Sequence, residues 1–299
     1  VLFFRLIICP MFDKHLSNKF ITLKGEASFN NIGDISGAAK IASAFGSSNA
    51  ICIVKHGNPC GFAIKETLIE AYTEALKCDP VSAFGGVVAV NGIVTLDLAI
   101  KMNEIFLEVV FAADFTEEAE AELNKKKRIK LFKQGTKKLK MAKDTFNFKI
   151  VDGGFVYQDA DKVEDDEVKN SELKTRLGAT TQEKKDMEIA YKLASLTKSN
   201  CVVYVKNSVM VAVGMGMTSR VDAAKAALRK AADMGIDTKG SVLASEAFFP
   251  FRDSIDAAFE AGVKCVIEPG GSVRDNEIIE AANEFGMALY FSGKRHFLH

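Results

Sequence analysis

The chain has 299 residues, 48% of them hydrophobic and 26% charged, and its 39 basic residues balance its 39 acidic ones. This composition excludes an intrinsically disordered chain and suits one large hydrophobic core or two smaller ones. The formal net charge of zero provides no global attraction to nucleic acid or to a membrane surface.

Residues 1–23 form an atypical N-terminal segment. The apolar run Val1–Pro10 is interrupted by Arg5, so it is too short to span a bilayer. It also lacks the basic flank and small-residue cleavage site of a secretory signal. The absence of Met at position 1 predicts a fragment or a processed product.

Two stretches of the chain echo each other. Residues 48–56 read Ser-Asn-Ala-Ile-Cys-Ile-Val-Lys-His, and residues 199–207 read Ser-Asn-Cys-Val-Val-Tyr-Val-Lys-Asn. Short apolar runs bounded by polar residues are typical of buried strands. A helical pattern precedes each run, over Asp34–Phe45 and over Glu183–Lys198.

A Phe-rich loop follows each predicted strand, at Asp79–Gly86 and at Ser245–Asp253. The shared order of helix, strand and loop favours a duplication over a chance echo. We therefore predict an α/β fold with two related halves, residues 24–150 and residues 151–299.

The segment Lys125–Lys143 contains ten Lys or Arg residues. We interpret it as a solvated helix and loop between the halves, because such runs commonly keep a surface hydrated. A nucleic-acid patch and attraction of an anionic substrate are the alternatives.

The cysteines predict a reducing environment. None of the six are spaced as C-x-x-C, which argues against a zinc or dithiol site. Cys52, Cys201 and Cys265 lie in apolar runs and are predicted to be small core residues. A cytoplasmic location follows as the expectation.

Lys55 and His56 end the first predicted strand and precede a turn rich in Gly, Asn and Pro. Ligands of open α/β sheets bind at strand ends, where an imidazole can accept a proton and an ammonium can stabilise negative charge. The alternative is purely structural, with a lysine that caps the strand and a histidine that bonds locally.

Two further motifs predict ligand contacts. Phe248–Asp253 holds three phenylalanines and a proline, which suit an apolar slot for a flat ring, with Asp253 on its polar edge. Gly214–Arg220 precedes a predicted helix over Val221–Met234 and suits a mononucleotide phosphate, although it matches neither a P-loop nor a Rossmann fingerprint. A packing loop and an ordinary helix start are the respective alternatives.

The remaining motifs lie near the two ends of the chain. Ser28–Asp34 caps a helix but carries more amides than a cap requires. Lys294–His299 contains two of the four histidines and follows a strand-like segment at Gly286–Ser292, so it is either a disordered tail or a segment that docks back onto a site.

Together these motifs resemble the transformylase part of the bifunctional AICAR transformylase/IMP cyclohydrolase family of purine biosynthesis, where AICAR is aminoimidazole carboxamide ribotide. The resemblance extends from about Lys24 to His299. The motifs are Asn-Asn-Ile, Val-Lys-His-x-Asn-Pro-Cys-Gly, Asp-Pro-x-Ser-Ala-Phe-Gly-Gly, Ser-Asn-x-x-x-Tyr-x-Lys-Asn, Gly-x-Gly-x-x-Ser-Arg, Ala-Phe-Phe-Pro-Phe-Arg-Asp, Pro-Gly-Gly-Ser-x-Arg-Asp and Arg-His-Phe-x-His.

The resemblance implies two tandem cytidine-deaminase-like α/β/α sandwich repeats and a formyl transfer from 10-formyltetrahydrofolate to AICAR. It implies catalytic roles for Lys55, His56 and Asn200. It implies ligand contacts for Asn31, Phe84, Gly85, Glu108, Arg220, Phe248, Pro250, Phe251, Asp253, Arg295 and His299. The deaminase zinc signature is missing, since Cys60 has no partner at Ala63, so no metal site is expected.

The same resemblance implies that folate is a co-substrate and not a tightly bound cofactor, that the protein is a homodimer with shared active sites, and that potassium is a structural ion. Neither nucleic acid nor a membrane is expected as a partner. Two departures stand out: the preceding IMP cyclohydrolase domain and the opening Arg-Tyr-Gly-x-Asn-Pro-His-Gln motif are absent. A folded nucleotide-binding fragment without catalysis is therefore the alternative function.

Overall fold

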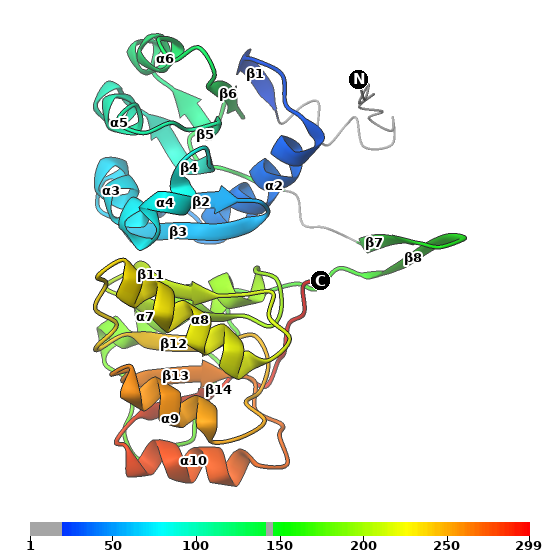
Figure 1. Ribbon diagram of the computed structural model, residues 1–299, viewed down its shortest axis with the longest axis vertical. Coiled ribbons are helices and arrows are strands. Elements are labelled where there is room, and N and C mark those ends of the chain that lie inside the picture. Colours follow the sequence, from blue (N-terminus) through cyan, green and yellow to red (C-terminus); the bar gives the residue numbers. More distant parts are fainter. Residues whose placement is uncertain (1–19, 142–145) are drawn as a thin grey trace. The chain divides into compact units, whose positions relative to one another are not determined.

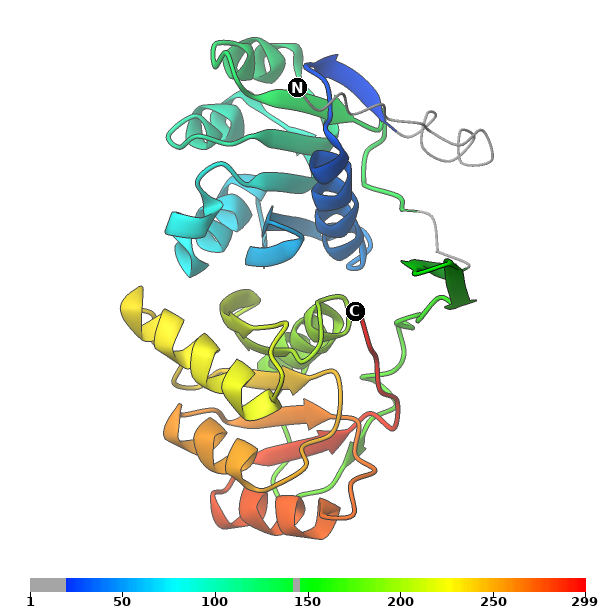
Figure 2. The ribbon, with the colours of Figure 1, turned by 45° about the vertical axis from the view of Figure 1, so that its right-hand side comes forward.

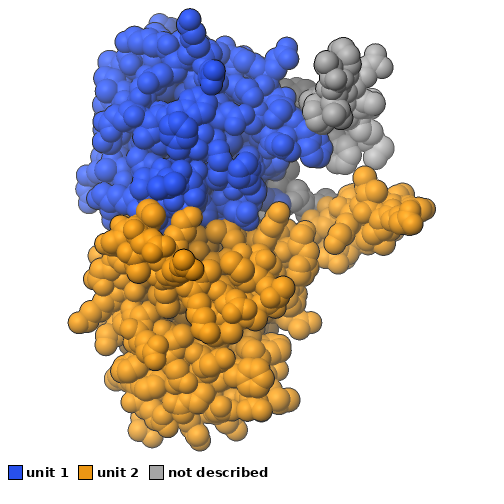
Figure 3. Space-filling view, viewed as in Figure 1, with its two compact units in different colours: residues 1–141 blue, residues 142–299 orange. Residues whose placement is uncertain are grey.

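The computed structural model describes residues 20–141 and 146–299. The chain divides into a first compact unit that ends at Met141 and a second that begins at Ala142 (Figure 3). Helices alternate with strands in both units, which confirms the predicted α/β class (Figure 1). Most of the atypical segment 1–23 lies outside the described residues.

The sheet of the first unit has the strand order β1-β6-β5-β4-β2-β3. Strands β4, β5 and β6 are parallel, whereas β2 runs antiparallel to both β3 and β4. Helix α2 covers one face, and α3, α5 and α6 cover the other (Figure 2). The elements are β1 (Ile21–Lys24), α2 (Phe29–Ser43), β2 (Asn49–Lys55), β3 (Asn58–Lys65), α3 (Leu68–Cys78), α4 (Pro80–Ala83), β4 (Val87–Val94), α5 (Leu96–Met102), β5 (Val109–Phe115), α6 (Glu117–Asn124) and β6 (Lys130–Lys133).

The second unit repeats this plan with the strand order β11-β10-β12-β13-β14-β9. Here α7 covers one face, and α8, α9 and α10 cover the other (Figure 2). A separate hairpin, β7–β8, precedes them. The elements are β7 (Phe146–Val151), β8 (Gly154–Asp159), β9 (Glu172–Leu173), α7 (Thr181–Ser195), β10 (Val202–Lys206), β11 (Val209–Gly214), α8 (Arg220–Asp233), β12 (Val242–Ser245), α9 (Asp253–Glu260), β13 (Cys265–Glu268), α10 (Asp275–Glu284) and β14 (Ala288–Phe291).

The pairing pattern is the same in both units. In the second unit β10 is antiparallel to β11 and β12, and β12, β13 and β14 are parallel. The first unit has the same pattern: β2 is antiparallel to β3 and β4, and β4, β5 and β6 are parallel. The sequence echo therefore marks equivalent strands, β2 and β10, that follow equivalent helices, α2 and α7.

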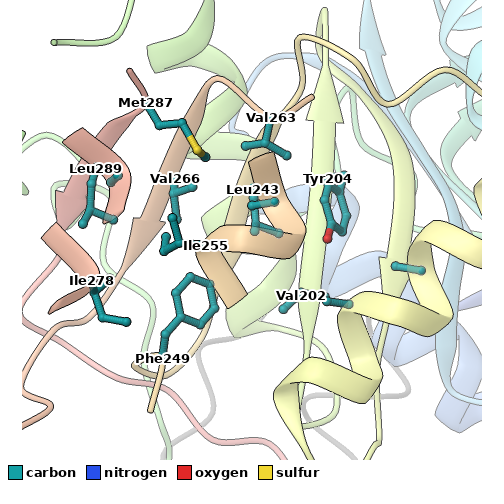
Figure 4. Packing of buried hydrophobic residues seen from close by; sticks show 14 of the residues in the cluster. Val202, Tyr204, Leu243, Phe249, Ile255, Val263, Val266, Ile278, Met287 and Leu289 are labelled. Atoms are coloured by element: carbon teal, nitrogen blue, oxygen red, sulfur yellow. The ribbon is translucent and has the colours of Figure 1, made fainter. Parts of the chain in front are cut away.

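The core of the second unit fills the space between the sheet and helices α8–α10 (Figure 4). Val202 and Tyr204 alternate along β10, so both point to this side of the sheet, and they share one core cluster with Ile255 of α9 and Ile278 of α10. Burying one such large apolar side chain contributes about 1.5–3 kcal/mol. The predicted core cysteines Cys52, Cys201 and Cys265 are all buried.

The prediction for the basic run was wrong in part. A strand, β6, occupies its centre, and Leu131 and Phe132 are buried in the sheet. Lys138 donates to the carbonyl oxygens of Ser48 and Asn91, so it belongs to the fold and not to a hydrated surface. The prediction considered only the number of positive charges. The run also contains an apolar pair flanked by lysines, and this pattern is compatible with a short buried strand.

A carboxylate on the first helix of each unit binds the turn of the following hairpin. Asp34 Oδ1 accepts a hydrogen bond from Gly57 N at 2.6 Å. Asp186 accepts hydrogen bonds from Asn207 N at 2.8 Å and Ser208 N at 2.7 Å. Each aspartate lies at the same distance along its helix from the capping residue, Ser28 or Thr180. The two units therefore share this tertiary hydrogen bond.

We expect Asp186→Ala to lower the free energy of unfolding by about 2–4 kcal/mol, because two backbone N–H groups lose a buried charged acceptor. Urea unfolding of the second unit, followed by circular dichroism, measures the change. Asp233→Ala, on the exposed end of α8, serves as the control and should change stability by less than about 0.5 kcal/mol. Equal effects of the two substitutions would contradict the assignment.

Candidate functional site

The predicted pair Lys55–His56 lies where β2 ends. His56 and Gly57 form the two-residue turn to β3, with φ angles of 51° and 76°. Two successive positive φ angles are typical of a type I′ turn, which holds its side chains away from the sheet. The His56 side chain is accordingly exposed. It is therefore available to a ligand and is not used for packing.

The Lys55 ammonium binds the loop that precedes β4. Its Nζ donates to the carbonyl oxygens of Gly85 at 2.7 Å and Phe84 at 3.2 Å. Gly85 has φ of 67°, a conformation that favours glycine, and a Cβ built there would lie 3.1 Å from Lys55 Nζ. The structure thus brings together Lys55, Phe84 and Gly85, all three of them predicted site residues.

Asn31 and Glu108, two further predicted contacts, meet beside this loop. Asn31 Nδ2 donates to Glu108 Oε1 at 2.9 Å, and Lys130 Nζ donates to Asn31 Oδ1 at 2.6 Å. The Asn31 hydrogen bond, opposed by burial and aided by the charges of Lys130 and Lys55, lowers the pKa of Glu108. Glu108 is therefore a carboxylate near the Lys55 ammonium. Lys130 was not predicted as a site residue because it lies within the basic run.

All these groups lie at one edge of the first sheet. Because β2 is antiparallel to β4, the end of β2 lies beside the start of β4, and Glu108 and Lys130 stand at the starts of β5 and β6. The rule that ligands bind at the carboxyl ends of strands describes β2 here, but not the parallel strands β4–β6.

In the second unit, Arg220 is held by acidic and hydroxyl groups. Its guanidinium donates to Glu246 Oε1 at 2.8 Å and to Ser245 Oγ at 2.7 Å, and the Arg220 and Glu246 side chains are only 9% and 1% exposed. Glu246 Oε1 also accepts Cys201 N at 3.1 Å. A nucleotide contact for Arg220 stays a prediction, and Glu246 was missed because it lies 26 residues away in sequence.

Asn200 lies directly before Cys201 and the start of β10. Its Nδ2 donates to the carbonyl oxygen of Met217 at 2.9 Å, and its backbone N donates to the same atom at 3.2 Å. The loop before α8 is thereby fixed to the start of β10. Asn200 and Arg220 thus occupy neighbouring positions around the Cys201–Glu246 hydrogen bond.

The Phe-rich loop divides between core and surface. Phe249 is only 1% exposed and belongs to the same core cluster as Ile255, so the packing-loop alternative describes this residue. Phe251 is 50% exposed, and the Arg274 guanidinium lies 4.9 Å from its ring centroid. The predicted contacts Phe248 and Pro250 are half-buried, and Asp253 is exposed at the start of α9.

The C-terminal segment docks onto the second unit. His296 is fully buried, with Nδ1 2.8 Å from Asp161 Oδ1 and Nε2 2.7 Å from Glu167 Oε2. Lys294 Nζ donates to the other oxygen of Glu167 at 2.7 Å. Arg295 and His299, the predicted contacts, flank this anchor and are exposed on either side of Phe297. His296 lies within the predicted C-terminal motif, but its role as an anchor was not predicted.

The sequence model of the AICARFT/IMPCHase bienzyme family matches residues 10–230. The chain belongs to this family. It is 46% identical over 275 residues to the "Bifunctional purine biosynthesis protein PurH" of Persephonella marina, an alignment that covers 92% of the chain and 52% of that protein. It is 42% identical over 290 residues to the protein of the same name from Aquifex aeolicus, covering 97% and 56%. The chain spans about half the length of these relatives.

The described residues also bear on two expectations, for a metal ion and for a membrane. In the described part of the chain, no cluster of three or more His, Cys, Asp or Glu side chains is arranged to hold a metal ion. Potassium stays a prediction of the resemblance. No helix within residues 20–141 or 146–299 has the length and apolar character needed to cross a membrane.

We expect His296→Ala to detach the C-terminal segment, because the substitution leaves Asp161 and Glu167 facing a buried gap. The free energy of unfolding should fall by about 2–4 kcal/mol, and carboxypeptidase should release the last residues faster. His299→Ala, at an exposed position, is the control for stability. The anchor role would be refuted if both variants resisted digestion as well as the unmodified chain.

Proposed function

We propose that this chain performs the AICAR transformylase reaction, in which 10-formyltetrahydrofolate formylates the amine of AICAR. The observation that carries the proposal is the exposed His56 in the turn directly after Lys55, whose ammonium is bound by the Phe84–Gly85 loop, in a member of the AICARFT/IMPCHase family. Two relatives carry the name of a bifunctional purine biosynthesis protein, which supports the same assignment.

The proposed chemistry assigns His56 the role of base. The AICAR amine attacks the formyl carbon, a carbinolamine forms, and the bond from that carbon to the folate N10 then breaks. His56 accepts the proton that the amine loses, and N10 gains a proton as tetrahydrofolate departs. Lys55 stabilises negative charge on the carbinolamine oxygen or on the departing nitrogen.

The second unit contributes the remaining roles in this proposal. Asn200 orients the formyl oxygen, and Arg220, Arg295 and His299 contact the nucleotide side. The loop from Phe248 to Asp253 receives the folate, a flat ring with a polar edge. The folate is a co-substrate that leaves after each turnover, and no metal takes part.

The finer architecture also belongs to the proposal. We assign each unit to the cytidine-deaminase-like α/β/α fold, which the identical strand pairing of the two units supports. We further propose a cytoplasmic homodimer with shared active sites. The longer protein to which such a chain corresponds would also carry IMP cyclohydrolase activity.

The test is His56→Asn. Asn tolerates the positive φ at this turn, and Asn207 occupies the equivalent turn of the second unit, so the substitution preserves the hairpin. Loss of a positioned base should reduce kcat by about 10²–10⁴-fold, measured as formation of the formylated nucleotide. The dissociation constant for AICAR should change by less than about threefold.

The matched control is Asn207→His, which places an imidazole on the equivalent turn and should leave turnover unchanged. Undiminished turnover by His56→Asn would refute the role of His56. Tight binding of AICAR without turnover by the unmodified chain would instead favour the alternative, a nucleotide-binding fragment that lacks catalysis.

A further inference from the structure

Glu268 is a buried carboxyl group between two loops of the second unit. It is the last residue of β13 and its exposure is 0%. Its Oε2 accepts hydrogen bonds from Phe249 N at 3.0 Å and from Gly270 N at 3.3 Å. One oxygen atom thus connects the Phe-rich loop to the loop Pro269–Arg274.

The same two loops also meet at the surface. The Arg274 guanidinium stacks over the half-exposed Phe251 ring at 4.9 Å. Gly270, with φ of 73°, lies so close to the Phe291 ring that a Cβ would be 2.6 Å from it. The Pro269–Arg274 loop is therefore fixed against β14 on one side and against the Phe-rich loop on the other.

We propose that Glu268 is a positioning residue, which uses its two backbone hydrogen bonds to hold the Phe248–Asp253 loop in the shape that binds the folate co-substrate. This inference rests on the proposed function. It adds a residue that the sequence motifs did not single out. Glu268 is fully buried, so it acts through the loop, in which Phe249 is buried and Phe251 is half-exposed.

The chemical state of Glu268 makes this role dependent on pH. Burial raises its pKa from 4.5 to about 8; the N–H groups of Phe249 and Gly270 oppose the rise, Asp275 adds to it and Arg220 reduces it. At neutral pH the group is therefore mainly a neutral acid. Oε1 has no hydrogen-bond partner among the described residues, so no donor stabilises a negative charge on that oxygen.

The sign of the stability effect follows from this raised pKa. The folded chain holds the proton more tightly than the unfolded chain, so the contribution of Glu268 to stability is complete below about pH 4.5 and is lost as pH rises towards 8. Above that pH the carboxylate is buried without an ion-pair partner of its own, since Arg220 is bound by Glu246. The loop should then loosen.

The experiment compares the unmodified chain with Glu268→Gln and Glu268→Ala. Calorimetry at pH 6.5 and pH 9.5 gives the dissociation constants for 10-formyltetrahydrofolate and for AICAR. The amide of Glu268→Gln imitates the neutral acid, so folate affinity should be independent of this pH change. In the unmodified chain, folate affinity should fall about five- to tenfold at the higher pH.

Glu268→Ala removes both backbone hydrogen bonds. It should weaken folate binding about tenfold at either pH, while AICAR binding changes by less than about twofold. Thermal unfolding supplies a second measurement: the melting temperature of the unmodified chain relative to Glu268→Gln should decrease between pH 5 and pH 8. Glu260→Gln, on the exposed end of α9, is the control and should reproduce the unmodified chain throughout.

The possible failures are distinguishable. If the unmodified chain binds folate and Glu268→Gln shows the same pH dependence, or Glu268→Ala binds folate equally well, the positioning role is refuted while the proposed function stands. If the unmodified chain neither binds nor turns over the folate, the proposed function fails, and the inference fails with it.

Discussion

The hydrogen bond between a helix carboxylate and a hairpin turn is the constraint on which each unit depends. Asp34 and Asp186 occupy equivalent helical positions and bind equivalent turns. The bond joins the first helix to the first two strands, and therefore fixes where α2 or α7 crosses its sheet. A turn with positive φ angles costs energy for residues other than glycine, and the carboxylate offsets part of that cost.

This shared framework carries different chemistry in the two units. In the first unit the candidate groups gather where β2 ends and β4, β5 and β6 begin. In the second unit they gather at the opposite edge of the equivalent sheet, where β10 begins and β12 and β13 end. The turn that presents His56 in one unit presents the exposed Asn207 in the other, and Asp186 accepts a hydrogen bond from the backbone N of Asn207.

Much of this organisation could be predicted from the sequence, because the signals are local. The similar sequences at residues 48–56 and 199–207 identified β2 and β10. The Gly-, Asn- and Pro-rich sequence after Lys55 identified the turn. The partners of the site residues could not be predicted in the same way. Asn31 and Glu108 are 77 residues apart, and His296 and Glu167 are 129 apart, so only the fold brings them together.

Predictions made from charge and composition were wrong where side chains of the expected surface type are buried in the fold. Lysines that a count treats as a hydrated run are hydrogen-bonded into the first unit at Lys130 and Lys138. A phenylalanine cluster that suits a ligand slot sends Phe249 into the core. Residue type alone does not distinguish these cases, since the side of the chain that faces the sheet depends on strand register and on the exit direction of each loop.

The two buried glutamates of the second unit show how neighbouring strand ends acquire different properties from the same residue type. Glu246 follows β12 and is compensated by the Arg220 guanidinium, so its charge holds α8 against the sheet. Glu268 ends the next strand, β13, has only backbone N–H donors, and is therefore mainly uncharged at neutral pH. A buried charge with a cation costs less than one without, so the first acid can fix a helix while the second can hold a loop only in its neutral form. The exposed groups proposed for chemistry and binding, such as His56 and Phe251, depend on buried polar groups of this kind for their position.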